Sequence, residues 1–177
     1  MERTINEYII LEQISSTGIA TLFKAKDPSR PDEIALKAFR PLVSEHKIAI
    51  DALSTEIERI VDVRNPSIIS VFEKGNEEQT HWLAMEFSQH PTLDELLTKS
   101  FTLTQTMTVL EQLCTVINDI GSTGIHHGDL KPSNIFVNLE DGSIKVSDFG
   151  MASLSKALPN NLQESSNTPL AAYTAPE

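Results

Sequence analysis

The sequence predicts an α+β fold, with a length that allows one domain or two small lobes, and three observations support this fold class. Short segments with strand-like alternation fill most of residues 8–87, and one amphipathic helical pattern lies among them. A longer helical pattern covers residues 104–120, and a polar, proline-containing loop follows it at residues 125–134. Strands that precede helices along the chain are typical of the α+β class. The strand patterns end at residue 87, so the chain divides into residues 1–87 and residues 88–177, called here the first and the second lobe.

Composition narrows the possible functions. The chain has 177 residues, 40% of them hydrophobic and 6% aromatic, which allows a modest core. Its 14 basic and 25 acidic residues give a net charge of -11, which argues against nucleic acid or an anionic membrane as a partner. The single cysteine, Cys114, cannot form an internal disulfide, so a reducing, cytoplasmic setting is expected. We see no apolar run long enough for a membrane segment.

The first lobe is expected to hold a five-stranded antiparallel sheet and one helix. Five segments have strand-like patterns: residues 8–14, 20–25, 34–39, 68–74 and 81–87. The first two are joined by residues 15–19, and a turn with two prolines precedes the third. In residues 48–61 apolar side chains recur at helical spacing, namely Ile50, Leu53, Ile57, Ile60 and Val61.

The second lobe is expected to be helical before and around the polar loop. Thr92 and Glu95 match a capping box at the start of a short helix. The helix at residues 104–120 is expected to bury one face, formed by Met107, Leu110, Leu113, Cys114, Ile117 and Ile120. If nothing covers that face, it forms an exposed apolar patch.

The polar loop and a second acid after it carry the chemistry. Asp129, Lys131 and Asn134 lie in a turn stiffened by Pro132, and Asp148 follows a hairpin signalled by Asp141-Gly142. That hairpin should bring Asn134 and Asp148 to one end, close enough to share metal ions. A carboxylate can accept a hydroxyl proton, a lysine can neutralise a phosphate, and amide and carboxylate oxygens can hold Mg²⁺.

Residues 125–134 and 146–150 resemble the catalytic loop HRDLKPxN and the DFG motif of protein kinases, with Gly128 where most members carry Arg. The resemblance implies a kinase-like bilobal fold that uses ATP and Mg²⁺. It implies Asp129 as the catalytic base, Lys131 as the phosphate stabiliser, and Asn134 and Asp148 as the metal ligands.

The first lobe extends the resemblance to the nucleotide site. Residues 34–39 are similar to the VAIK strand, which implies that Lys37 contacts the α- and β-phosphates and pairs with Glu56 of the following helix. Glu58 is the competing partner, about 200° away on the helix. The adenine-binding positions implied by the family are Leu22, Ala35, Phe136 and, in the hinge after Met85, Glu86 and Ser88.

The glycine-rich loop departs from the family pattern. Its three glycine positions hold Ser15, Thr17 and Ala20, and Gly18 is out of place. A β-branched Thr17 keeps the backbone further from a phosphate, although its hydroxyl could donate a hydrogen bond in return.

Two departures concern the second lobe. Residues 151–174 read as a polar loop whose hydroxyl residues are candidate phosphorylation sites: Ser153, Ser155, Ser165, Ser166 and Thr168. Because Gly128 replaces the Arg that would bind such a phosphate, we hypothesise that phosphorylation of this loop is not the switch.

Residues 173–177 match the APE region, after which family members carry further helices. We expect either a longer gene product or a partner chain that supplies them.

Three functions remain open. The first is a Ser/Thr protein kinase that acts on a protein substrate, because Lys131 and Pro132 favour Ser/Thr over Tyr by family analogy. The second is a pseudokinase or nucleotide-binding scaffold, which the altered glycine-rich loop favours. The third is a small-molecule phosphotransferase, which Gly128 favours and the Asp148-Phe149-Gly150 motif opposes.

Overall fold

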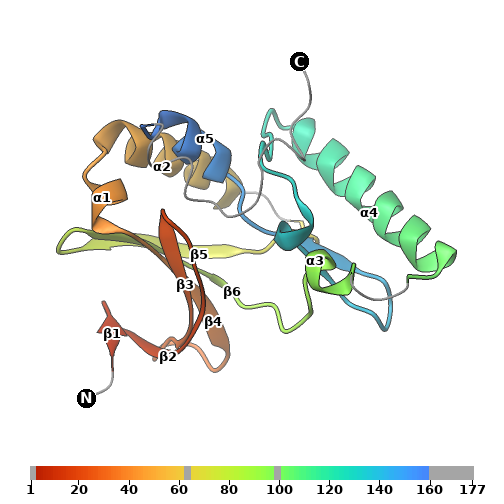
Figure 1. Ribbon diagram of the computed structural model, residues 1–177, viewed down its shortest axis with the longest axis horizontal. Coiled ribbons are helices and arrows are strands. Elements are labelled where there is room, and N and C mark those ends of the chain that lie inside the picture. The colour runs from red at the N-terminus through yellow and green to blue at the C-terminus, as the bar shows by residue number, and fades with distance from the viewer. Residues whose placement is uncertain (1–2, 62–64, 98–100, 160–177) are drawn as a thin grey trace.

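The computed structural model describes residues 3–61, 65–97 and 101–159, and within them it shows a curved antiparallel sheet beside a helical region (Figure 1). The sheet order is β1-β2-β3-β4-β6-β5. Its strands are β1 (Thr4–Ile5), β2 (Tyr8–Ser16), β3 (Ala20–Lys26), β4 (Glu33–Phe39), β5 (Val71–Glu77) and β6 (Thr80–Glu86). The described sheet therefore has six strands, and the expectation of five was wrong. The extra strand, β1, has two residues, too few to show a periodic pattern.

Helices α2, α3 and α4 and the second, smaller sheet follow the expected order along the chain, whereas α1 and α5 were not expected. The helices are α1 (Pro41–Ser44), α2 (Lys47–Val61), α3 (Leu93–Leu96), α4 (Leu103–Gly121), α5 (Met151–Ala157) and the 3₁₀ helix η1 (Pro132–Asn134). Strands β7 (Ile135–Val137) and β8 (Ile144–Val146) pair as the expected hairpin. Thr92 and Glu95 form the predicted capping box of α3, in which each side chain accepts a backbone N–H of the other residue.

The start of β5 differs from the expectation because Ile68 and Ile69 pair with strand β8 instead. Ile68 forms a parallel bridge with Val146 of β8. The N–H of Ile69 donates to the carbonyl of Val146 at 2.9 Å. These bonds fasten the sheet to β8 close to Asp148.

A continuous apolar core connects the two parts. It contains α2, the face of the sheet beneath α2, the buried side of α4, the β7-β8 hairpin and α5. A smaller cluster covers the other face of the sheet, where the rings of Tyr8 and Trp82 meet edge to face with centroids 5.2 Å apart. Burial on both sides explains why the central strand β4 is almost entirely apolar.

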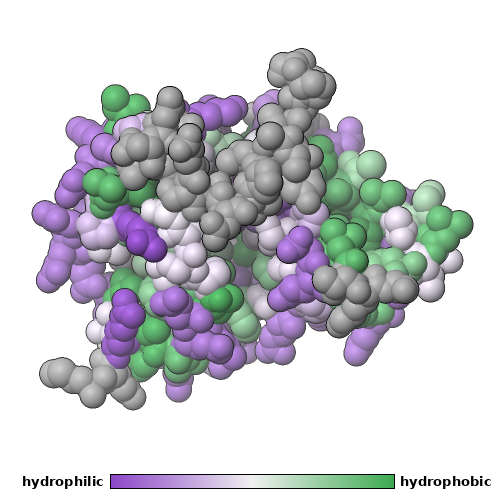
Figure 2. All heavy atoms as spheres, viewed as in Figure 1, coloured by the Kyte–Doolittle hydropathy of each residue, from purple (hydrophilic) through white to green (hydrophobic). Residues whose placement is uncertain are grey.

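Helix α4 buries only part of the face that was predicted, namely Ile120 and, half-buried, Leu113. Val109, Val116 and Ile120 are buried, and Leu113 is half-buried. Apolar residues cover two adjacent faces of this helix, so their spacing alone did not decide between them. The predicted face is largely exposed, in a stripe formed by Leu103, Met107, Leu110, Cys114 and Ile117. Figure 2 shows apolar surface gathered over the α4 side of the molecule. Among the described residues, no helix is long and apolar enough to cross a membrane.

Helix α5 corrects the expectation of an irregular loop after residue 150. Gly150 takes a left-handed backbone with φ of 84°, and the helix begins at the next residue. Met151 and Leu154 are buried, and α5 lies against α2 (Figure 1). The candidate sites Ser153 and Ser155 lie on this helix. Ser165, Ser166, Thr168 and the APE region at residues 173–177 lie outside the described residues.

Candidate active site

The catalytic loop brings three predicted side chains together. Lys131 precedes η1, whose first residue is Pro132, and the turn folds Asn134 back toward Asp129. The Lys131 ammonium lies 2.8 Å from Oδ2 of Asp129. The Asn134 amide donates to the backbone carbonyl of Asp129 at 2.9 Å, and Asn134 is only 3% exposed. This places a carboxylate, an ammonium and an amide within one turn of chain.

His127 ties this loop to the second acid, a role that the sequence reasoning missed. Its Nδ1 accepts the Asp129 N–H at 3.2 Å, so Nε2 carries the proton and donates to the Ser147 carbonyl at 2.7 Å. The ring also lies 4.5 Å from that of Phe149. Burial lowers the pKa of His127, which keeps the imidazole neutral and the two hydrogen bonds in place near neutral pH. The position of His127, two residues before Asp129, was the one sequence feature that could have indicated this role.

Lys37 reaches the same site from β4. Its Nζ lies 2.6 Å from Oδ1 of Asp148, and the two side chains are 13% and 25% exposed. Burial alone would raise the pKa of Asp148, but Lys37, together with His127 and Lys131, lowers it below the ordinary carboxyl value. Asp148 is therefore a carboxylate near neutral pH, held with φ at 67° in the left-handed region.

The expected pair between Lys37 and Glu56 is not formed in this structure. Lys37 bonds Asp148 instead, and the Glu56 carboxylate faces Arg59 of the same helix at 3.4 Å. The backbone at Gly150 lies close to Glu56, since a methyl group added at Gly150 would be 2.9 Å from the Glu56 Cβ. Glu58, the alternative partner, bonds Lys74 of β5 at 2.7 Å.

The residues expected around adenine come from both parts of the fold. Ala35 is buried in the main core, and Leu22 and Phe136 pack half-buried against that core. At the end of β6, the Glu86 carboxylate bonds Lys145 of β8 at 2.6 Å.

The hinge backbone is also fixed by local bonds. The Glu86 N–H donates to the Ser70 carbonyl at 2.9 Å. The Ser88 hydroxyl accepts the His90 N–H at 3.3 Å. These bonds hold the segment that connects β6 to α3.

The turn between β2 and β3 uses its own side chain to satisfy its backbone. The Thr17 hydroxyl accepts the N–H groups of Ile19 and Ala20 at 3.3 and 3.2 Å, and it donates to the Ala20 carbonyl at 3.1 Å. The expectation that this hydroxyl could donate to a phosphate therefore does not hold here. In glycine-rich loops such backbone N–H groups bind phosphate, whereas here the hydroxyl oxygen of Thr17 already accepts them.

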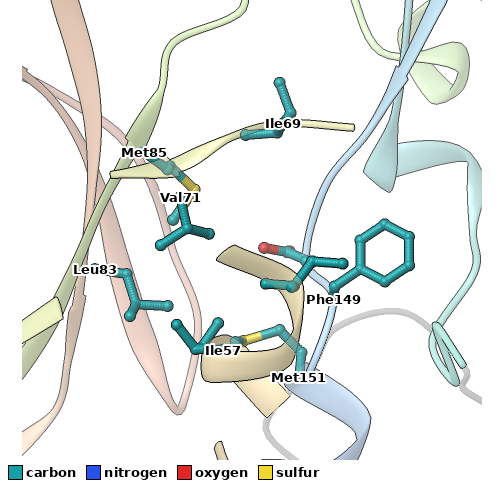
Figure 3. Close-up of a pocket in the computed structure, with 9 residues that line it drawn as sticks. Ile57, Ile69, Val71, Leu83, Met85, Phe149 and Met151 are labelled. Atoms are coloured by element: carbon teal, nitrogen blue, oxygen red, sulfur yellow. The ribbon is translucent and has the colours of Figure 1, made fainter. Parts of the chain in front are cut away.

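A small apolar cavity of about 20 Å³ lies behind Met85, between α2 and the sheet. Ile57 of α2, Val71 and Leu83 of the sheet, Phe149, and Met151 at the start of α5 surround it (Figure 3). Asp148 also lines this cavity. The cavity wall therefore joins the second acid to both helices.

The oxygen atoms at the site suit a Mg²⁺ ion that is also bound by the phosphates of a nucleotide. Asn134 and Asp148 supply amide and carboxylate oxygens, and the Ser147 N–H bonds the Asn134 carbonyl at 2.9 Å, which fixes the two segments side by side. Within the part of the chain that the structure describes, no three His, Cys, Asp or Glu residues form a metal-binding group. Mg²⁺ commonly takes one or two protein ligands and completes its shell with phosphates and water, so two ligands are sufficient.

This combination of a curved sheet, an acid-lysine-asparagine turn and a lysine paired to a second acid defines a kinase-like phosphotransfer fold. The family model for the protein kinase domain matches residues 8–177. The chain belongs to the protein kinase domain family.

Comparisons with individual proteins agree with this assignment. The chain is 29% identical over 153 residues to the serine/threonine-protein kinase PrkC of Bacillus subtilis, covering 85% of this chain and 24% of PrkC. It is 28% identical to the probable serine/threonine-protein kinase PknB of Lactococcus lactis, covering 97% of this chain and 28% of PknB. The chain thus spans about a quarter of the length of these curated relatives.

Solved structures show the same fold. The Mycobacterium tuberculosis PknI kinase domain matches with a TM-score of 0.75 at 18% identity, covering 86% of this chain and 62% of that domain. A structure of Rad53 residues 1–466 in complex with AMP-PNP matches with a TM-score of 0.70 at 26% identity, covering 82% of this chain and 38% of that chain.

Proposed function

We propose that this chain carries out transfer of the γ-phosphoryl group of Mg-ATP to Ser or Thr hydroxyls of a protein substrate. The observation that carries the proposal is the meeting of Lys131 with Asp129 at 2.8 Å, beside the Lys37-Asp148 pair at 2.6 Å. Phosphoryl transfer requires a carboxylate near the attacking hydroxyl, a carboxylate for the metal ion, and cations for the phosphates. The Asp129-Lys131 and Asp148-Lys37 pairs supply these groups. The Ser/Thr kinases among the relatives support the substrate class.

In this proposal the chain's own residues divide the work. Asp129 accepts the proton of the attacking hydroxyl, and Lys131 offsets the charge of the transferring phosphoryl group. Lys37 binds the nucleotide phosphates, while Asn134 and Asp148 hold Mg²⁺, which bridges and neutralises the phosphates when bound. His127 acts as a positioning residue for the backbone of Asp129.

The adenine would lie between the two lobes, which we place at residues 1–87 and 88–177. Leu22, Ala35 and Phe136 offer apolar contacts to the ring, and the backbone of Glu86 and Ser88 offers hydrogen bonds. The match to a structure that binds AMP-PNP supports this placement.

The lone Cys114 supports a reducing, cytoplasmic setting. A partner chain or further helices would cover the exposed stripe of α4.

The Thr17 hydrogen bonds favour a second candidate, a pseudokinase that binds nucleotide weakly or not at all. A thermal unfolding experiment with ATP, with and without Mg²⁺, separates binding from its absence. A ligand at about 100 times its dissociation constant stabilises by about 2.7 kcal/mol. Mg-dependent stabilisation together with phosphate transfer to a generic protein supports the kinase. Stabilisation without transfer supports the pseudokinase.

A further inference from the structure

Helix α4 carries a polar residue, Gln112, on its buried stripe. Val109, Val116 and Ile120 form this stripe, and all three are buried. Gln112 lies three positions after Val109 and four before Val116, so it shares their face of the helix, where it is half-buried. An amide among buried side chains needs partners for both its oxygen and its nitrogen. The partners of Gln112 therefore indicate the role of this position.

Both polar atoms of the Gln112 amide bond the backbone of the β7-β8 hairpin. Nε2 donates to the Gly142 carbonyl at 2.7 Å, and Oε1 accepts the Ile144 N–H at 3.2 Å. The amide thus bonds a carbonyl and an N–H two positions apart on β8, as a neighbouring strand would. One helical turn earlier, Thr108 approaches the same hairpin, since a methyl group added at Gly142 would lie 2.9 Å from its Cγ2. Helix α4 therefore contacts the hairpin through two successive turns.

The hairpin connects the two residues expected to bind magnesium. Asn134 immediately precedes β7, and Asp148 lies two positions after the end of β8. Near Asp148, the Val146 N–H of β8 donates to the Ser67 carbonyl at 2.8 Å. Strand β8 is therefore held at two points, by Gln112 near the hairpin turn and by Ser67 near the second acid.

Gln112 also joins the chain before the catalytic loop to the chain after it. Helix α4 ends at Gly121, the loop that contains Asp129 follows, and the hairpin comes after the loop. The two bonds from Gln112 to the hairpin span 30 and 32 positions of the chain. This contact therefore bears on the spacing between Asp129, which follows the helix, and Asp148, which follows the hairpin.

We propose that Gln112 is a positioning residue: its amide fixes the β7-β8 hairpin against α4 and thereby holds Asp148 beside Asn134 to bind the metal ion. The inference rests on the proposed function, which assigns Asn134 and Asp148 to Mg²⁺. The effect of Gln112 passes through the backbone of β8. Replacing a residue that orients metal ligands from outside the site typically lowers metal affinity or activity by about 10- to 100-fold.

Three substitutions on α4 separate positioning from packing. Gln112→Met has a similar length and suits a helix, but it removes both hydrogen bonds to the hairpin. Gln112→Glu keeps an acceptor for the Ile144 N–H and removes the donor to the Gly142 carbonyl. Glu111→Met is the matched control, because Glu111 is exposed on the same helix.

The experiment measures the dissociation constant of ATP by calorimetry at increasing Mg²⁺ concentrations, with circular dichroism to verify folding. We expect Gln112→Met to need about tenfold more Mg²⁺ to reach the affinity of the parent chain, with unchanged affinity for ATP alone. Gln112→Glu should need about threefold more, because one of the two bonds remains. Glu111→Met should match the parent chain.

The dependence on Mg²⁺ distinguishes positioning from a general loss of structure. Folded Gln112→Met with the Mg²⁺ dependence of the parent chain overturns the inference. An equal loss of affinity with and without Mg²⁺ also overturns it, because positioning of a metal ligand acts only through the metal. If Gln112→Met does not fold, Gln112→Glu decides by the same criteria.

Amide hydrogen exchange gives a readout that needs no nucleotide. The Ser147 N–H bonds the Asn134 carbonyl at 2.9 Å, directly before Asp148. Gln112→Met should speed exchange at Ser147 by about tenfold, while the amides of β4 exchange as in the parent chain. Unchanged exchange at Ser147 overturns the inference, and so does an equal acceleration in β4, which would show general destabilisation.

Phosphate transfer, measured on the same samples, tests the proposed function separately. A Mg²⁺-specific loss in Gln112→Met without transfer in any sample supports the positioning role and contradicts the kinase activity. Transfer in every sample with one common Mg²⁺ dependence supports the kinase activity and overturns the positioning role. If no sample binds ATP, the proposed nucleotide site fails, and exchange at Ser147 decides whether Gln112 positions the hairpin.

Discussion

The Lys37 ammonium and the Asp148 carboxylate meet at 2.6 Å although 111 positions separate them in the chain. This pair joins strand β4, inside the sheet, to the segment that follows the β7-β8 hairpin. It is mostly shielded from water, with exposures of 13% and 25%, so solvent screens it less than a surface pair. The pair adds a polar link between the two parts of the fold, beside the apolar core that connects them.

Lys37→Met should weaken both stability and nucleotide binding. Removing the ammonium leaves a partly buried carboxylate without its cation, which costs about 1–3 kcal/mol. Chemical denaturation measures this loss, and Mg-ATP titration should show reduced affinity. Lys74→Met is the control, because the Lys74-Glu58 pair is 36% and 70% exposed and should contribute less than about 1 kcal/mol. Equal losses in the two variants would contradict the importance of the buried pair.

The pH dependence of stability should report Asp148. Its pKa is lowered in the folded protein, so it stabilises the fold above the ordinary carboxyl pKa, and that contribution is lost as pH falls through the lowered value. Denaturation between about pH 6 and pH 3 should therefore show a steeper loss in the parent chain than in Asp148→Asn. Identical slopes would show that the carboxylate is not held by Lys37 in solution.

Thr17→Gly should increase affinity for Mg-ATP. The substitution frees the N–H groups of Ile19 and Ala20, which the hydroxyl now accepts, and makes them available to phosphate. We expect about fivefold tighter binding, which is less than one full charge-assisted hydrogen bond because glycine also loosens the turn. Ser16→Gly adds the same flexibility without freeing these donors and should not tighten binding. A gain in both variants would point to flexibility alone.

Two glycines provide a matched pair for packing. A methyl group at Gly75 would overlap the Trp82 ring, whereas at Gly121 no other heavy atom lies within 4 Å of such a group. Gly75→Ala should cost about 1–3 kcal/mol through overpacking. Gly121→Ala, at the end of α4, should instead stabilise by up to about 1 kcal/mol. Thermal and chemical denaturation test both, and a neutral Gly75→Ala would mean that the Trp82 ring can move aside.

Much of this fold could be predicted because its signals are local. Strand alternation located β2, β3, β4 and β6, helical spacing located α2, and the capping box located α3. The turn around Pro132 also predicted that Asp129, Lys131 and Asn134 meet. Each of these depends on side chains a few positions apart.

What could not be predicted depends on packing between distant segments. The burial of Met151 and Leu154 shows the apolar spacing of α5, but surrounding serines made that segment read as a loop. Lys37 of β4 pairs with Asp148, 111 positions later in the chain, and not with Glu56, a choice that no pattern within α2 encodes. The face of α4 that is buried depends on what packs against it.

The most direct test of the proposed chemistry measures phosphate transfer from Mg-ATP to a generic protein by the chain and by Asp129→Asn. The matched control is Asp141→Asn, the same change at the exposed end of the β7-β8 hairpin. We predict that the parent chain and Asp141→Asn transfer phosphate and that Asp129→Asn loses transfer by about 10²-fold or more, as for loss of a general base. Unchanged transfer in Asp129→Asn would contradict the account.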